Sequence, residues 1–249
     1  MKYGALEAGG TKMVCAVGED DGTILEQISI PTRFPEETIP PIIDYFKGKN
    51  ISALGIAGFG PLDLDPDSET YGYITATTKP GWSNYNLAGT FSDALKIPIG
   101  LDTDVNGSLL GETTYGDSAG LSDVLYITIG TGIGGGILSG GSVVHGMQHP
   151  ELGHIRMVPH PKDTYRGKCP FHGTCLEGMA SGPAIEERWG AKAVTLSGQE
   201  EVWELEAYYI GQALADLILT VSPKRIILGG GVMHQTQLFP LIRKAVKKE

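Results

Sequence analysis

Short apolar runs separated by polar turns make up the first part of the chain. Residues 3–17 are apolar on both sides of the stretch 7–12, which contains two glycines. The turn residues Asp20-Asp21-Gly22 and a β-rich stretch, 23–31, follow. This alternation predicts a strand, a glycine turn, a second strand, a further turn and a third strand.

The next hundred residues alternate between helical and strand patterns. We predict a helix over 38–47, with its two prolines in the first turn, where proline is tolerated. Leu87, Phe91, Ala94 and Leu95 recur at helical spacing. The remaining segments predict a buried strand over 53–59, a short strand over 98–103 and a helix over 105–115.

The opening pattern then occurs a second time. Residues 124–129 predict a strand, 130–132 a glycine turn and 133–138 another strand. Further on we predict an amphipathic helix over 202–217, a strand over 225–228, a glycine turn and a final pair of helices. The repeat indicates a duplicated, two-lobed α/β fold with an N-terminal lobe, 1–115, and a C-terminal lobe, 116–249. We place the boundary near 115–122.

Composition excludes several classes of protein. The 249 residues are 41% hydrophobic and 19% charged, which is typical of a globular protein. We find no apolar run of about 18 residues and no secretory signal, so we expect a cytoplasmic protein without a membrane span. The net charge of −10 is spread along the chain and argues against nucleic acid as a partner. The 36 glycines gather in clusters, which indicates close approach of the backbone to a ligand.

The first glycine turn is a candidate phosphate site. Its residues are Gly9, Gly10, Thr11 and Lys12. Glycines there let backbone N–H groups face a phosphate, and the Thr11 and Lys12 side chains add donors. Glu7 could hold magnesium through water. An ordinary tight hairpin with solvated charges explains the same residues equally well.

The second turn resembles a dinucleotide fingerprint but lacks its context. Residues 130–135 satisfy G-x-G-x-x-G, with Thr131 and Gly132 at the turn. The fingerprint must open a helix, whereas the stretch that follows here is turn-rich and strand-like. We therefore reject a dehydrogenase and expect a second phosphate-facing hairpin. Gly229, Gly230 and Gly231 follow a strand and suit the adenosine or phosphate end of a nucleotide, or simply a close crossing of strand and helix.

Asp104 stands where a buried strand gives way to a helix. A carboxylate there could accept the proton of a hydroxyl nucleophile, which phosphoryl transfer requires. The spacing alone favours the simpler explanation, helix capping by Asp104 or Thr103.

A cysteine–histidine cluster gives the sharpest metal signal. His154, Cys169, His172 and Cys175 supply two imidazoles and two thiolates, a ligand set for a tetrahedral structural zinc. His160 competes for the fourth position, and two free cysteines with surface histidines are the alternative. Cys15 lies mid-strand and is expected in the core. With only three cysteines, a disulfide framework is not expected.

Other polar and aromatic residues could contact a sugar. Glu151 and Glu177 bracket the zinc segment and could bind a polyol or be solvated surface charges. The loop with Pro80, Gly81 and Trp82 could present its ring to a sugar or to a lobe interface. A packed tryptophan explains that loop equally well.

In this order along nearly the whole chain, these segments resemble the ROK family of sugar kinases and repressors, within the actin-like/hexokinase-like ATPase superfamily. The resemblance implies that ATP binds in a cleft between the lobes with its phosphates at both glycine turns, that magnesium bridges the phosphates, and that Asp104 is the catalytic base. It further implies that four residues orient the sugar: Asn106, Glu151, His154 and Glu177.

The resemblance is stronger to one branch of that family. At the positions of Glu7, Thr103 and His172, many members of the family have Asp, Asn and Cys, respectively. In these three departures the chain resembles the bacterial fructokinases. The branch implies transfer from ATP to the 6-hydroxyl of fructose, with mannose and glucose as alternatives, and a homodimer. Members usually run some tens of residues further, so part of the adenosine side is expected beyond Glu249.

Two other functions belong to different classes. Repressors of the family carry a DNA-binding segment before the first phosphate motif, and we expect none here because the first strand begins at about Lys2. A non-catalytic sugar-sensing protein is the second, and Asp104 argues against it.

Overall fold

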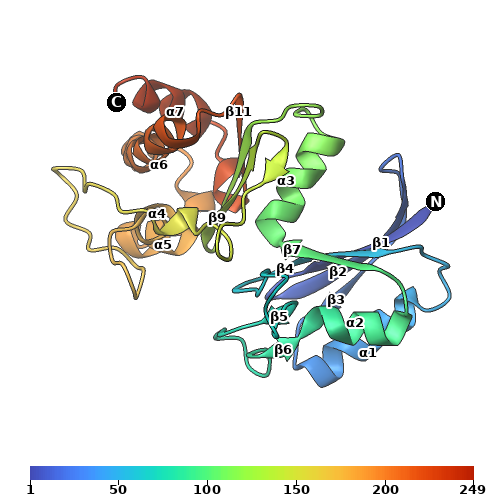
Figure 1. Ribbon diagram of the computed structural model, residues 1–249. Helices are drawn as coiled ribbons and strands as arrows, with labels where there is room; N and C mark the ends of the chain where they lie inside the picture. The colour runs from blue at the N-terminus through green and yellow to red at the C-terminus, as the bar shows by residue number, and fades with distance from the viewer. The chain divides into compact units, whose positions relative to one another are not determined.

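The computed structural model describes residues 1–249, which form two compact units (Figure 1). Unit 1 consists of Met1–Ala119 together with the short segment His145–His149. Unit 2 consists of Gly120–Val144 and Pro150–Glu249. The chain therefore leaves unit 2 after Val144, contributes five residues to unit 1 and returns to unit 2 at Pro150.

Unit 1 is built on a five-stranded sheet in the order β3-β2-β1-β4-β7. β1 pairs antiparallel with β2 and parallel with β4, and β4 pairs parallel with β7. Along β1 the side chains alternate, so Leu6 is buried while Glu7 is exposed. The strands are β1 Lys2–Ala8, β2 Lys12–Glu19, β3 Ile24–Pro31, β4 Leu54–Gly58 and β7 Ile99–Thr103.

Helices and one small hairpin complete unit 1. They are α1 Pro35–Phe46, the hairpin of β5 Tyr73–Ile74 and β6 Tyr85–Asn86, α2 Leu87–Leu95 and α3 Asp104–Thr114. The core of the unit includes Phe46, Trp82 and Cys15, each at most 2% exposed. Burial raises the pKa of the Cys15 thiol to about 12, as befits the core residue that the sequence predicts.

Unit 2 repeats the strand order of unit 1 with four strands, β10-β9-β8-β11. β8 pairs antiparallel with β9 and parallel with β11, just as β1 pairs with β2 and β4. The strands are β8 Val124–Ile129, β9 Ile133–Ser139, β10 Ser142–Val143 and β11 Arg225–Gly229. This repeat confirms the duplicated α/β topology predicted from the two strand–turn–strand patterns.

The helices of unit 2 bury a second, separate core. The 22-residue helix α6 contributes the fully buried rings of Trp203 and Tyr209 to it. The elements are η1 Leu152–His154, α4 Leu176–Ala180, α5 Gly182–Trp189, η2 Ala193–Thr195, α6 Glu200–Val221, η3 Gly231–His234 and α7 Leu238–Val246.

Two local predictions need correction, and two helices were not predicted. Helix α1 begins three residues earlier than predicted, with Pro35 at its first position, so Pro40 and Pro41 lie inside the helix and not in its first turn. The predicted final pair of helices is one short 3₁₀ turn, η3, followed by α7. No local pattern pointed to α4 and α5, which follow the cysteine segment directly.

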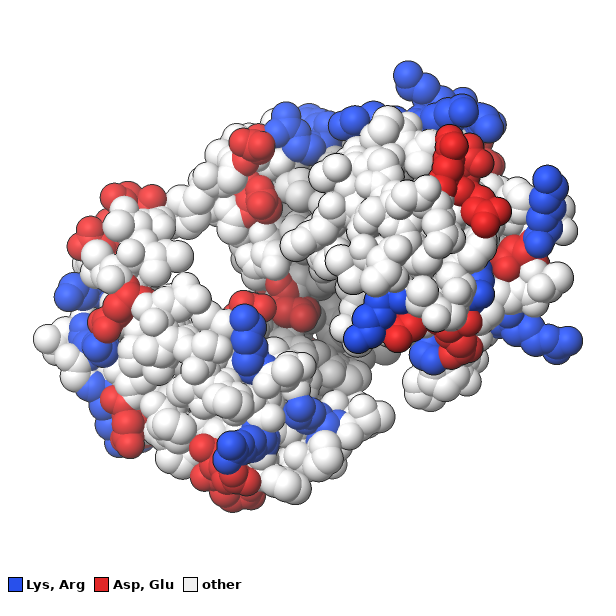
Figure 2. Space-filling model, turned by 180° about the vertical axis from the view of Figure 1, so that it is seen from behind, with Lys and Arg blue, Asp and Glu red and all other residues white.

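The surface carries both signs of charge. Figure 2 shows acidic and basic side chains interspersed over the face that it presents. No helix is both long enough and apolar enough to cross a membrane.

Candidate active site and metal centre

The carboxyl ends of three parallel strands lie in register in unit 1. Ala8 of β1 pairs with Gly58 of β4, which pairs with Thr103 of β7. One residue earlier, Glu7 and Asp102 flank Ala57 in the same way, so their side chains project from one face of the sheet. Two strand spacings, roughly 10 Å, separate their backbones. The first glycine turn and the start of α3 therefore follow neighbouring strand ends.

The first glycine turn is held by its carbonyl groups. The Thr32 hydroxyl donates to the carbonyl of Gly9 at 2.6 Å, and the Thr32 amide donates to that of Thr11 at 3.0 Å. The Lys79 ammonium donates to the carbonyl of Gly10. The amides of Gly10 and Thr11 take no part in the backbone hydrogen bonds of this turn. The carbonyl groups of this turn are therefore held by hydrogen bonds within the protein, and the N–H groups of Gly10 and Thr11 are suited to bind an anion.

Asp104 is not the N-cap residue of α3. Thr103 is the N-cap of α3, and its hydroxyl accepts a hydrogen bond from the Asn106 amide at 3.2 Å. Asp104 is the first helical residue and is exposed, with one carboxylate oxygen accepting from the Val105 amide at 2.8 Å. Of the two capping candidates left open by the sequence, the structure therefore selects Thr103.

Asn106 lies beneath this helix start, 1% exposed. Its amide nitrogen donates to Asp102 at 2.7 Å, and its oxygen is buried without a partner. The second Asp102 oxygen lies 2.8 Å from Nε2 of His145. No sequence pattern singled out Asp102 or His145 because their partnership joins positions 43 residues apart.

Trp82 is a packed core residue. Its ring is fully buried between Phe59 and Tyr85, and its indole N–H donates to the carbonyl of Arg33 at 2.7 Å. The expectation that this ring faces a sugar is therefore corrected in favour of the packed alternative. Pro80 and Gly81, in contrast, are exposed. Pro80 lines a cavity of about 370 Å³ together with Thr32 and Lys79, the two residues that hold the first glycine turn.

In unit 2 the second glycine turn, the glycine segment 229–231 and the start of α5 converge. The second turn closes on itself through a 2.9 Å bond from the Gly130 amide to the Gly132 carbonyl, and Thr131 at its tip is exposed. The Gly130 carbonyl accepts from the amide of Gly182, the first residue of α5. A Cβ atom on Gly230 would lie 2.4 Å from the carbonyl oxygen of Ile129, so that glycine is required for close packing. Gly229 and Gly231 flank it. Because β9 follows the turn, no dinucleotide fingerprint is present.

Glu177 joins this turn to the cysteine segment. One of its carboxylate oxygens accepts from the Ile133 amide at 3.0 Å. A Cβ atom on Gly153 would lie 1.9 Å from the Ile133 carbonyl oxygen, so η1 packs directly on the start of β9. The exposed Glu151 precedes η1, and His154 ends it. Glu177 and η1 therefore both lie against the start of β9, directly after the second turn.

The four predicted metal ligands come together. The ligand atoms of His154, Cys169, His172 and Cys175 all lie within 4.8 Å of one another. Nδ1 of His154 lies 3.8 Å from Cys169 Sγ and 3.5 Å from Cys175 Sγ. Two nitrogens and two sulfurs at this spacing suit a tetrahedral metal ion. Burial raises the pKa of the Cys175 thiol to about 11, so a cation is needed to favour the thiolate.

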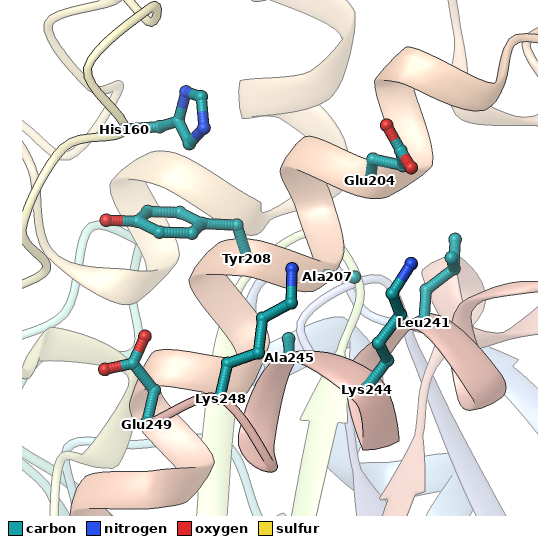
Figure 3. A pocket seen from close by; sticks show the side chains of 9 residues that line it. All are labelled: His160, Glu204, Ala207, Tyr208, Leu241, Lys244, Ala245, Lys248 and Glu249. Atoms are coloured by element: carbon teal, nitrogen blue, oxygen red, sulfur yellow. The ribbon is translucent and has the colours of Figure 1, made fainter.

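The rival ligand, His160, lies elsewhere. Its ring packs edge-on against Tyr208, with the ring centroids 4.9 Å apart. It lines a cavity of about 380 Å³ between α6 and α7, which Lys244 and Lys248 also face (Figure 3). None of the predicted site residues lines that cavity.

The duplicated α/β topology, with a glycine turn in each unit, is that of the actin-like ATPase fold. The chain belongs to the ROK family, which it matches over residues 3–249. A solved ROK hexokinase from Thermus thermophilus superposes with a TM-score of 0.82 at 27% identity, covering 100% of this chain and 90% of that one.

Curated relatives are closer in sequence. A Bacillus subtilis protein is 56% identical over 245 residues, 98% of this chain and 82% of that one. A Lactococcus lactis protein named fructokinase is 46% identical, covering 97% of this chain and 83% of that one. A Halalkalibacterium halodurans glucokinase is 27% identical, covering 92% and 80%.

Proposed function

We propose that this protein is an ATP-dependent hexose kinase that transfers the γ-phosphate of ATP to the 6-hydroxyl of D-fructose. The observation that carries the kinase assignment is the exposed carboxylate of Asp104 at the end of β7, one strand from the end of β4 and two from the first glycine turn. Fructose is favoured because relatives named fructokinase are much more similar in sequence than those named glucokinase.

We assign both glycine turns to the binding of nucleotide phosphates. In unit 1, Gly9, Gly10, Thr11 and Lys12 offer backbone and side-chain donors to phosphate oxygens. In unit 2, Thr131 and Gly132 do the same, and Gly229, Gly230 and Gly231 approach the adenosine side. Two observations support this role for the first turn. Its carbonyl groups accept hydrogen bonds from Thr32 and Lys79, and the N–H groups of Gly10 and Thr11 make no backbone hydrogen bond there.

Asp104 acts as the general base. Its carboxylate takes the proton from the 6-hydroxyl, whose oxygen forms a bond to the γ-phosphorus. The bond between that phosphorus and the oxygen that bridges it to the β-phosphate breaks, and ADP leaves. Since Thr103 caps α3, the Asp104 carboxylate is not needed for capping.

Four polar side chains are proposed to orient the sugar. We assign Asn106, Glu151, His154 and Glu177 to this role, with Pro80 and Gly81 forming part of the sugar's surroundings. Trp82 would act indirectly, because its buried ring fixes the loop that carries Pro80 and Gly81. Nδ1 of His154 faces the cysteines, which leaves Nε2 for a hydroxyl, the usual second partner of a metal-bound histidine.

Two metals complete the proposal. His154, Cys169, His172 and Cys175 would hold zinc, and with all four positions occupied by protein the ion is structural. Glu7 would hold magnesium through water, and the ion would neutralise charge on the phosphates. We also propose a homodimer, which light scattering coupled to size exclusion would test.

A coupled assay that measures ADP release tests the function directly. Fructose, mannose, glucose and N-acetylated hexosamines would be compared at equal concentrations with Mg-ATP. We expect the highest kcat/KM with fructose. Preference for mannose or glucose would reassign the substrate within the family, and sugar binding without turnover on any hexose would favour a sugar-sensing protein.

A further inference from the structure

His145 belongs to a segment that returns to unit 1. The chain on both sides of 145–149 is part of unit 2, yet these five residues pack with unit 1. Nε2 of His145 lies 2.8 Å from a carboxylate oxygen of Asp102. The Asp102 side chain is only 17% exposed and the His145 side chain 40%, so solvent screens this contact only in part.

The same carboxylate organises the start of α3. Its other oxygen accepts from the Thr103 amide at 2.8 Å and from the Asn106 side chain at 2.7 Å. Asp102 therefore joins His145 to the N-cap residue of the helix and to a proposed sugar residue. Hydrogen bonds to an ionised carboxylate are stronger than neutral ones, so this junction holds its partners firmly.

The orientation of Asn106 depends on this junction. An ionised carboxylate only accepts hydrogen bonds, so the amide nitrogen of Asn106 must face Asp102 and the amide oxygen must point away. That oxygen is buried and has no partner in the protein. Nothing on the oxygen side fixes the amide, and a buried acceptor of this kind is suited to a donor supplied by a ligand.

We infer that His145 is a positioning residue for the sugar site. By holding Asp102, it keeps the Asn106 oxygen directed toward a sugar hydroxyl and steadies the first turn of α3, which carries Asp104. The inference rests on the proposed kinase function. It assigns to the segment 145–149 a role in binding sugar that is separate from the zinc cluster and from both glycine turns.

Steady-state kinetics of two variants test the inference. His145→Ala removes the donor, so we expect the KM for fructose to rise about tenfold, the effect of one lost hydrogen bond. The KM for ATP should stay within about twofold because the phosphate turns are untouched. His145→Gln places an amide donor near the position of Nε2 and should recover most of the loss. His160→Ala, in unit 2, is the matched control and should behave as the wild type.

A double-mutant cycle with Asp102→Asn shows whether His145 acts through Asp102. The double variant should be no worse than the more damaged single variant, since both changes break one junction. Additive effects, an unchanged KM for fructose in His145→Ala, or equal rises in both KM values would overturn the inference. A wild-type protein that phosphorylates no hexose would instead overturn the proposed function.

Discussion

The carboxylate of Glu177 lies 3.0 Å from the amide nitrogen of Ile133 and accepts its hydrogen bond. Glu177 is two residues beyond the proposed zinc ligand Cys175, whereas Ile133 begins the strand after the second glycine turn. A change at the proposed zinc cluster can therefore affect the second glycine turn, and a change at the turn can affect the cluster, through the Glu177 side chain. This connection separates the roles of the two glutamates proposed to bind sugar.

Glu177→Ala should weaken the binding of both substrates. Loss of the carboxylate releases the Ile133 amide and loosens the phosphate turn, so we expect the KM values for ATP and fructose each to rise about five- to tenfold. Glu151→Ala, which leaves that bond in place, should raise the KM for fructose alone. Initial-rate measurements with each substrate varied in turn would check this, and identical profiles for the two variants would contradict it.

Asp104→Asn should abolish most of the turnover. The amide cannot accept a proton, so kcat should fall at least about 10²-fold, the lower range for loss of a general base, while fructose binding by calorimetry should change little. Asp93→Asn removes an exposed carboxylate of α2 in the same unit and should leave kcat unchanged. Near-wild-type turnover of Asp104→Asn would show that the residue is only part of a helix start.

Elemental analysis should find one zinc per chain. Cys169→Ser or Cys175→Ser should lose the metal and become more sensitive to proteolysis between 154 and 175, because this segment is rich in exposed residues and cannot order itself by burial. Both variants should raise the KM for fructose more than the KM for ATP.

Two histidine variants serve as controls for the ligand assignment. His172→Cys should retain zinc because three thiolates and one imidazole also form a tetrahedral site. His160→Ala should retain it because that ring packs on Tyr208. If His160→Ala lost zinc while His154→Ala kept it, the assignment would be wrong, and the double role of His154 with it.

Glu206 should make stability depend on pH. Its side chain is fully buried in α6 without a hydrogen-bond partner, and burial raises its pKa well above the ordinary value of 4.5, although the positive charge of Arg188 opposes the shift. The folded protein therefore holds a proton that the unfolded chain releases above pH 4.5. The contribution of this group to stability is full below that pH and declines as pH rises toward the folded pKa.

Glu206→Gln removes this titration. The Tm of the variant relative to wild type should increase between pH 5 and pH 8, by about 2–4 °C for each 1 kcal/mol lost by the wild type. Circular dichroism melts at both pH values measure the difference. Glu204→Gln, exposed on the same helix, should show no such trend. A constant difference for Glu206→Gln would mean that folding does not raise the pKa of this carboxyl.

The sequence predicted the strands on both sides of the glycine turns and most of the metal cluster, because the residues that form them lie close together in the chain. Apolar runs and the glycine turns between them identified β1, β2, β8 and β9 to within about two residues. The spacing of Cys169, His172 and Cys175 predicted the cluster because these ligands lie within a short loop, although His154 joins from further away.

Features that depend on distant packing escaped these patterns. The sequence left two alternatives for Trp82, a ring that faces a sugar or lobe interface and a packed ring, and the contacts with Phe59 and Tyr85 that decide between them are not visible in the local pattern. The carbonyl partners of Thr32 and Lys79 depend on the folded sheet and loop, and no motif marks them. Asp102 and His145 are in contact only because the segment 145–149 packs with unit 1, although the chain on both sides of it belongs to unit 2.

The discontinuity of unit 1 bears on how the protein is made. A nascent chain that has reached Ala119 carries every strand of the first sheet, but Asp102 still lacks its imidazole partner. That partner follows only after β8, β9 and β10 have been translated. At about 5–20 residues per second, the segment from 119 to 149 takes roughly 2–6 s to synthesise. During that interval unit 1 has its complete sheet but lacks the contact between Asp102 and His145 that we propose to position Asn106.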